Sequence, residues 1–219
     1  MAVKRFRAGV IRVITLSDQK MRDLHGGLIE KYIPQIETES VCIEDQPEGV
    51  HSLYTKAMAV PKVIKAAGKF KDPDVIIVSC ADDPGVPELR ELLRIPVVGA
   101  GSSAAAFARL YGKRTGVIGI TDYAPEPFER VFGDGIINLG RPEGVKSTLD
   151  LMTDKGKSSV IKKAKQLKEA GADSISLVCT GMSTIGVAAD IERALDIPVV
   201  DPVLAEAVFA YHEILRTKI

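Results

Sequence analysis

Short hydrophobic runs alternate with helix-like segments along the chain. The runs are apolar and rich in β-branched residues, which is typical of strands buried on both faces, and they cover residues 8–15, 75–79, 95–98, 115–121, 173–178 and 197–200. The segments between them carry apolar residues at helical spacing, notably 18–32, 53–70, 99–112, 158–170 and 203–215. Strands that alternate with helices predict a doubly wound α/β fold with parallel sheets.

Weaker local signals complete this pattern. Asp83-Pro84 predicts a helix that is N-capped by the aspartate, has proline at its first position and runs to Leu93. Residues 41–43 predict a short strand and residues 145–152 a helix, while the glycine-rich segment 134–144 predicts no defined element.

Several of these motifs occur twice, in the same order. Gly9-Val10-Ile11 recurs as 116–118, Ile95-Pro96-Val97-Val98 recurs as 197–200, and Phe107-Ala108 recurs as 209–210. A duplicated half-chain predicts two similar Rossmann-like lobes, related by a pseudo-twofold axis and with their strand ends facing a shared cleft that holds the active site. We expect residues 1–98 with 202–219 to form lobe one and residues 99–201 to form lobe two.

Composition excludes several classes of function. The 29 basic residues balance the 29 acidic ones, so charge predicts neither nucleic-acid nor membrane binding. No apolar run approaches the roughly 18 residues that a membrane-spanning helix needs. Met1 to Arg7 is basic, but Arg12 interrupts the apolar stretch after it, which argues against a signal peptide. Three cysteines, an odd number, favour a reducing cytoplasm.

Two cysteines end two similar hydrophobic runs. Cys80 follows Val-Ile-Ile-Val-Ser and Cys179 follows Ser-Ile-Ser-Leu-Val, at equivalent positions of the repeat, and each precedes an expected helix start. Ligands bind at the carboxyl ends of strands in open α/β sheets, and a thiolate there can act as a base. Either cysteine alone is readily explained as an inert core residue, but the equivalence of the two favours chemistry. Cys42 lies within a strand, has no repeat partner and is expected to be structural.

Small and hydroxyl-bearing residues surround these positions. As candidate substrate-binding residues we take those that follow a strand end or open a helix: Thr15, Ser17, Ala81, Asp82, Ser102, Ser103, Thr121, Tyr123, Thr180 and Gly181. Helix capping explains Thr15 and Ser17 equally well. No His or Cys lies at ligand spacing from either cysteine, so no metal is predicted, and the three histidines are expected at the surface or within helices rather than as bases. Gly99-Ala100-Gly101 lacks the spacing and lysine of a phosphate loop.

The chain resembles the aspartate/glutamate/hydantoin racemase superfamily, and within it the hydantoin racemase branch. The resemblance is carried by Cys80 with Asp83-Pro84-Gly85, by Cys179-Thr180-Gly181-Met182, and by the two Ile-Pro-Val-Val motifs. It implies a homo-oligomer of two-lobed subunits that uses catalytic cysteines, and no cofactor, to invert an α-carbon of a small hydantoin or amino-acid-like molecule.

Two departures leave the substrate open. Thr15-Leu16-Ser17-Asp18 replaces an Asn-Pro-Asn-Thr-like stretch, and Ser102 replaces a glutamate that is frequent in that branch. Thr121-Asp122-Tyr123 is also similar to the Thr-Pro-Tyr of arylmalonate decarboxylases and maleate isomerases, which share the fold. Their chemistry, and a sensor that only binds a small carboxylate, are the alternatives.

Overall fold

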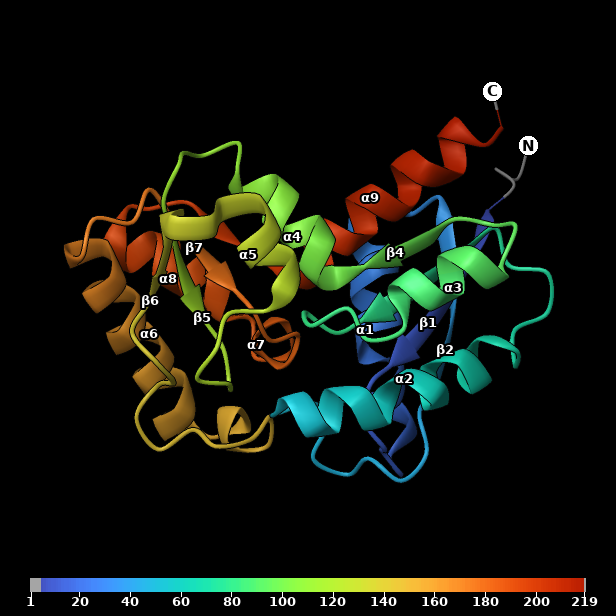
Figure 1. Cartoon of the computed structure of the whole chain (residues 1–219), viewed down its shortest axis with the longest axis horizontal. Coiled ribbons are helices and arrows are strands. Elements are labelled where there is room, and N and C mark those ends of the chain that lie inside the picture. The colour runs from blue at the N-terminus through green and yellow to red at the C-terminus, as the bar shows by residue number, and fades with distance from the viewer. Residues whose placement is uncertain (1–4, 219) are drawn as a thin grey trace. The chain divides into compact units, whose positions relative to one another are not determined.

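The computed structural model describes residues 5–218 of the chain (Figure 1). The first four residues, which begin the basic N-terminal segment, and residue 219 lie outside this range. The chain divides into two compact units. Unit 1 comprises residues 5–100 and 203–218 of the described part, and unit 2 comprises residues 101–202.

Unit 1 is built on a four-stranded parallel sheet with the order β2-β1-β3-β4. The strands are β1 (Phe6–Arg12), β2 (Ile36–Cys42), β3 (Val75–Ser79) and β4 (Val97–Gly99). The helices of this unit are α1 (Gln19–Tyr32), α2 (Leu53–Ala67), α3 (Val86–Leu92) and α9 (Pro202–Arg216). Helices α1 and α9 pack on one face of the sheet, and α2 and α3 pack on the other. Both faces are therefore buried, which explains why β3 is apolar up to its last residue.

Unit 2 repeats this plan with the order β6-β5-β7-β8. Its strands are β5 (Thr115–Ile118), β6 (Ile136–Asn138), β7 (Ser174–Leu177) and β8 (Val199–Val200). Its helices are α5 (Glu126–Phe132), α6 (Asp154–Glu169), α7 (Gly181–Thr184) and α8 (Val187–Leu195), with 3-10 turns η1 (Gly133–Gly135) and η2 (Asp150–Met152). Helix α4 (Ala100–Ala108) joins the two sheets along the chain. The α/β class with two parallel sheets is as predicted.

The repeat extends to individual hydrogen bonds. The Asp74 carboxylate accepts from the backbone N–H of Arg7 at 2.9 Å, and the Asp173 carboxylate accepts from the backbone N–H of Arg114, also at 2.9 Å. Each aspartate thus ties the entry of the third strand of its unit to the entry of the first. Similarly, the N–H of Ile76 donates to the Pro96 carbonyl and that of Ile175 donates to the Pro198 carbonyl. The two halves of the sequence fold by the same local rules.

Several predicted boundaries are wrong. β1 ends at Arg12 and β5 at Ile118, because the residues after them leave the ladder for loops, while β2 begins well before residue 41. The glycine-rich segment 134–144 contains the edge strand β6. Most of the expected helix at 145–152 is a loop, in which the Asp150 carboxylate accepts from the N–H groups of Lys146 and Ser147, leaving only η2 as a helical turn. This acceptor competes with a helical hydrogen-bond ladder.

The predicted start of α3 is also wrong. Asp83 adopts a left-handed conformation with φ of 49° and does not cap the helix; Gly85, with φ of 78°, precedes the first helical residue Val86. The carboxylate of Asp83 instead lies against the α-carbon of Gly99, where a β-carbon would be 2.4 Å from it. The carboxylate of Asp83 therefore contacts the end of β4 and makes no cap hydrogen bond to α3.

Candidate active site

Cys80 is partly buried at the carboxyl end of β3, packed against the apolar core beneath α2 and α3. Its backbone N–H donates to the carbonyl of Val78 at 2.9 Å, which makes a tight turn centred on Ser79. Its carbonyl accepts from the N–H of Asp83 at 3.1 Å. The cysteine thus sits between two turns, outside the regular hydrogen bonding of the sheet.

The side chain of Ser79 points to the opposite face of the sheet, toward α1 and α9. Its hydroxyl donates to Oε1 of Glu206 at 2.7 Å and lies 2.8 Å from Nδ1 of His25. All three side chains are buried, and His25 and Glu206 are 0% exposed. His25 was expected at the surface or as an ordinary helix residue; it is a helix residue, but it is buried in a polar network.

The residues after Cys80 are shielded from solvent. Ala81 and Asp82 are 3% and 6% exposed, and a carboxylate oxygen of Asp82 accepts from Nζ of Lys56 on α2 at 3.1 Å. Lys56 itself keeps a quarter of its side-chain surface exposed. This ion pair links the turn that carries Cys80 to the first turns of α2.

Thr15 and Ser17 are exposed beyond the end of β1. The Thr15 hydroxyl donates to the carbonyl of Ile43 and accepts from the N–H of Gln46, both at 2.8 Å, so it holds the loop after β2. The cap of α1 is Asp18, not either hydroxyl residue.

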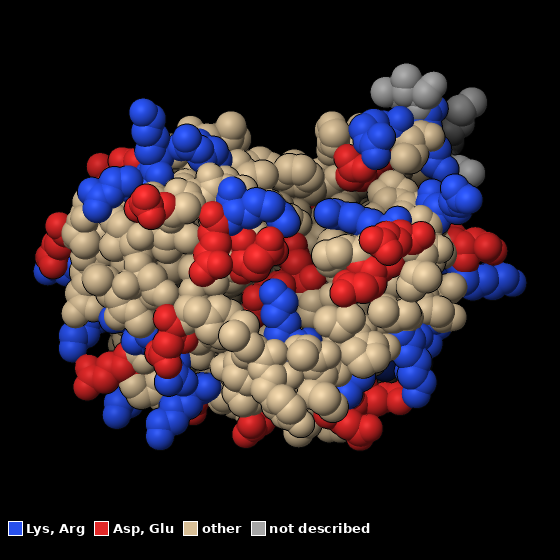
Figure 2. Space-filling model, viewed as in Figure 1, with Lys and Arg blue, Asp and Glu red and all other residues tan. Residues whose placement is uncertain are grey.

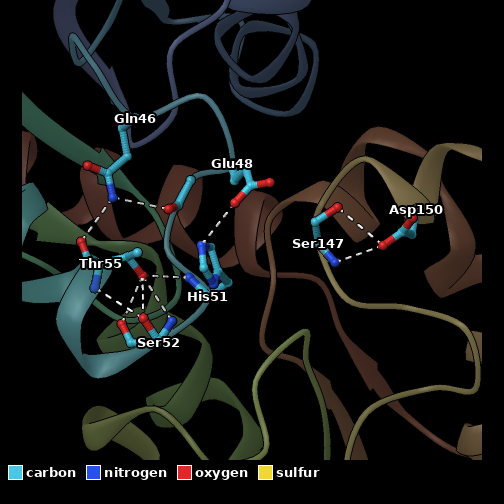
Figure 3. A network of polar contacts seen from close by, with 8 residues as sticks. Gln46, Glu48, His51, Ser52, Thr55, Ser147 and Asp150 are labelled. Atoms are coloured by element: carbon cyan, nitrogen blue, oxygen red, sulfur yellow. Dashed lines mark hydrogen bonds and ion pairs between the residues drawn. The ribbon is translucent and has the colours of Figure 1, made fainter.

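That loop is further ordered by a capping box at the start of α2 (Figure 3). The Ser52 hydroxyl accepts from the N–H of Thr55, while the Thr55 hydroxyl accepts from the N–H groups of His51 and Ser52. Gln46 donates to the carbonyls of Gly49 and Thr55. These hydrogen bonds hold the loop that follows β2, at the edge of the sheet in unit 1 where the strands end.

Cys179 follows β7 in unit 2 and is 8% exposed. Its Sγ lies 3.9 Å from the hydroxyl oxygen of Thr148, which the sequence did not single out. Thr148 also packs on Gly181, where a β-carbon would be 2.6 Å from its methyl group. The turn that carries Thr148 is held by Asp150 and Ser147 (Figure 3). Backbone hydrogen bonds from Lys146 and Ser147 lower the pKa of the Asp150 carboxyl.

The other predicted residues of unit 2 occupy the ends of its elements. Thr180 is the N-cap of the short helix α7, which begins at Gly181, two residues after Cys179. Thr121 and Tyr123 follow β5, and the Thr121 hydroxyl donates to the carbonyl of Tyr123 at 2.8 Å, a bond that closes the turn. Ser102 and Ser103 lie in the first turn of α4, and Ser103 is buried.

The two cysteines therefore have equivalent places in different units. Cys80 follows β3 and Cys179 follows β7, the third strands of two sheets with the same strand order. Their surroundings differ, because a helix starts two residues after Cys179, close to where it was predicted, whereas α3 begins six residues after Cys80. The third cysteine, Cys42, ends the edge strand β2 and is half-buried.

Among residues 5–218, no group of three or more His, Cys, Asp or Glu side chains could hold a metal ion. Basic and acidic side chains are interspersed over the face seen in Figure 2, in line with the balanced composition. None of the described helices is both long enough and apolar enough to span a bilayer.

Three features near the two cysteines were not predicted from the sequence. Around Cys80 these are the network of Ser79 and the Lys56–Asp82 ion pair, and beside Cys179 it is the contact with Thr148. Each joins residues that are far apart in the chain, up to 127 positions for Ser79 and Glu206. A serine in an apolar run was the available signal for the first. Thr148 gave none, because its segment was expected to be helical.

Comparison with known proteins identifies relatives. Residues 27–210 match the family model described as Asp/Glu/Hydantoin racemase. A hydantoin racemase from Pseudomonas sp. (strain NS671) is 26% identical over 179 residues, which cover 75% of this chain and 68% of that protein.

Solved structures share the fold. An allantoin racemase from Pseudomonas fluorescens superposes with a TM-score of 0.80 at 22% identity, covering 98% of this chain and 92% of the other. A double mutant of arylmalonate decarboxylase superposes with a TM-score of 0.68 at 16% identity, covering 95% and 92%.

Proposed function

Because the chain belongs to the Asp/Glu/hydantoin racemase family, we propose that it inverts an α-carbon of a hydantoin or amino-acid-like substrate, with Cys80 and Cys179 as its two acid–base groups. The observation that carries the proposal is the equivalence of the two cysteines, each at the carboxyl end of the third strand of a repeated unit. Such strand ends are where α/β sheets bind ligands.

The mechanism moves one proton on and one proton off the same carbon. The thiolate of one cysteine takes the α-proton, and the electron pair left behind spreads into the adjacent carbonyl as an enolate. The thiol of the other cysteine returns a proton to the opposite face of the carbon. One thiol and one thiolate remain, with their places exchanged, so the reverse reaction uses the same groups in exchanged roles.

Stabilising the enolate is the main task of the surrounding residues. An ordinary thiol has a pKa of about 8.5, whereas an α-proton is far less acidic, so developing negative charge on the carbonyl oxygen needs hydrogen-bond donors. We assign this role to N–H groups at Ala81, Asp82, Thr180 and Gly181, with hydroxyls of Ser102, Ser103 and Tyr123 as further contacts. The Thr15 and Thr121 hydroxyls have a secondary role, because each already donates its proton within its own loop.

A five-membered hydantoin ring suits this machinery best. Its ring carbonyls make the α-proton more acidic than that of a free amino acid, so fewer donors are needed. The relatives named hydantoin racemase and allantoin racemase support this substrate class.

The test is racemisation with isotope incorporation. The purified chain is incubated in D₂O with single enantiomers of a 5-substituted hydantoin, allantoin, aspartate and glutamate, and optical rotation and α-deuterium are followed by polarimetry and NMR. We expect one of them to racemise and to gain deuterium at the inverted carbon. Cys80→Ser and Cys179→Ser should each abolish racemisation. Cys42→Ser should keep it, since Cys42 ends the edge strand β2 and has no equivalent cysteine in the repeat.

Two-way racemisation retained in the Cys80→Ser or the Cys179→Ser variant would refute the two-thiol mechanism. Release of carbon dioxide from an arylmalonate, or isomerisation of maleate, with dependence on one cysteine would replace it by the chemistry of the relatives that share this fold. A ligand that raises the melting temperature without isotope exchange would indicate a binding protein.

A further inference from the structure

A buried polar cluster lies directly behind Cys80. Glu206 on α9, Ser79 at the end of β3 and His25 on α1 are joined by hydrogen bonds of 2.7 and 2.8 Å. Three separate elements of unit 1 thus converge on the residue that precedes the cysteine. Arg12, which pairs with Ser79 in the sheet, is also buried, and it donates to the carbonyls of Met21 and Arg22 on α1.

Stability does not explain such a cluster. Removing a carboxylate and an imidazole from water is costly, and hydrogen bonds at best offset that cost. Apolar side chains of the same volume would fill the space between β3, α1 and α9 at least as favourably. A different reason for keeping three buried polar residues at this place is therefore needed.

The repeat supplies an internal comparison. The position of Ser79 is held in unit 2 by Val178, that of Arg12 by Gly119, and that of Glu206 by Ala104. A γ-carbon of Val178 fills the space over Gly119, 2.8 Å from where a β-carbon would stand. The equivalent positions of unit 2 are therefore apolar and well packed, which shows that the fold itself does not need the polar set.

The sheet holds the residue before each cysteine. Ser79 is the last residue of β3 and pairs with Arg12 of β1, and the N–H of Val178 donates to the carbonyl of Ile118 on β5 at 2.8 Å. In unit 1 the chain turns directly after the sheet, because the N–H of Cys80 donates back to the carbonyl of Val78. Ser79 is the centre of this turn, and its side chain adds an anchor to α1 and α9 that Val178 cannot provide.

We propose that Glu206 and His25, acting through Ser79, are positioning residues for Cys80, whereas Cys179 follows an apolar valine and contacts Thr148 instead. This inference rests on the proposed role of Cys80 as an acid–base group. The single hydroxyl proton of Ser79 goes to Glu206, so Nδ1 of His25 carries a proton and donates to the Ser79 oxygen. The serine hydroxyl is thereby held from both sides, in one rotamer.

The experiment compares the two cysteines within one molecule. The full chain is treated with iodoacetamide, and alkylation of Cys80, Cys179 and Cys42 is followed separately by peptide mass spectrometry. Ser79→Ala removes the hydroxyl with no added bulk, and Ser79→Thr restores it. With the substrate that the wild type racemises, we expect Ser79→Ala to lower kcat about 10–100-fold with little change in KM. We also expect it to change the alkylation rate of Cys80 by about threefold or more. The rates of Cys179 and Cys42 should stay unchanged, and Ser79→Thr should restore that of Cys80.

A double variant distinguishes loss of the positioning role from loss of stability. Ser79→Ala leaves the Glu206 carboxylate without the Ser79 hydroxyl, so we pair it with Glu206→Met, which replaces the carboxylate by an apolar side chain of similar size. Circular dichroism and thermal melting check the fold. The double variant should show the same selective change at Cys80.

The outcomes separate this inference from the proposed function. Parallel changes at Cys80 and Cys179, or no change at Cys80, would overturn the positioning role even if the wild type racemises its substrate through both thiols. A selective change at Cys80 would support the positioning role even if the wild type racemised nothing in the panel.

Discussion

The carboxylate of Asp83 lies against the α-carbon of Gly99, so close that a β-carbon at residue 99 would be 2.4 Å from its carboxyl atoms. This contact brings together the turn after Cys80 and the end of β4. Both residues are buried, and the backbone of Asp83 is in the left-handed region. A side chain at residue 99 would therefore displace the carboxylate of Asp83 from this loop.

Gly99→Ala should destabilise the protein and displace this loop. The methyl group forces Asp83 out of a packed position, and overpacking of this kind costs about 1–3 kcal/mol. The free energy of unfolding from urea titrations measures the loss, and iodoacetamide alkylation of Cys80 reports the loop.

Gly27→Ala is the matched control. Gly27 lies within α1, and no heavy atom would come within 4 Å of its added β-carbon. Because alanine favours helices over glycine, this variant should gain about 0.5–1 kcal/mol. Equal changes in the free energy of unfolding for the two substitutions would show that the contact of Gly99 with Asp83 does not limit the size of residue 99.

Thr148→Val should weaken the function of Cys179 while leaving Cys80 unaffected. The Thr148 hydroxyl lies 3.9 Å from Sγ of Cys179, within reach of a weak hydrogen bond that favours the thiolate. Losing a bond worth about 0.5–1.5 kcal/mol lowers a rate by about 2–10-fold. We expect kcat and the alkylation rate of Cys179 to fall within that range, and Thr148→Ser, which keeps the hydroxyl, to behave like the wild type. An unchanged Cys179 in the valine variant would contradict the assignment.

Glu44 should add an acid-sensitive contribution to stability. Hydrogen bonds from Lys65, at 2.8 Å, and Lys69, at 2.9 Å, lower the pKa of its carboxyl from 4.5 to about 2. A carboxyl with a depressed folded-state pKa stabilises the fold above its unfolded pKa, and the contribution disappears as the pH falls through the folded value. The stabilisation should therefore be complete above pH 4.5 and fade between pH 4.5 and about 2.

Urea unfolding of the wild type and of Glu44→Gln at several pH values checks this window. The difference between the two proteins should be present at pH 6 and shrink toward pH 2. It should also shrink in about 1 M salt, since all three side chains are solvent-exposed and such pairs are screened. A difference that is constant over this pH range would rule out the ion pairs as its source.

The predictions from sequence succeeded where local pattern decides the outcome. The strand ending at Ser79 and the helix opened after Gly99 follow from apolar runs and spacing, and the matched hydrogen bonds of Asp74 and Asp173 show why the repeat was visible. The predictions failed where a side chain makes a contact that hydrophobic spacing does not encode. Asp83 was expected to cap a helix, but its carboxylate packs against Gly99. Residues 145–152 were expected to be helical, but the carboxylate of Asp150 accepts from two backbone N–H groups of that segment.

The sequence by itself determined the class of fold, the duplicated order of strands and the equivalence of Cys80 and Cys179, because these depend on the order and periodicity of residues along the chain. Only the tertiary structure decided that Ser79 meets His25 and Glu206, and that Thr148 lies beside Cys179. Those contacts join positions between 31 and 127 residues apart, and nothing in a local pattern encodes them. They arise when helices pack on sheets, and they make the environments of two equivalent cysteines different.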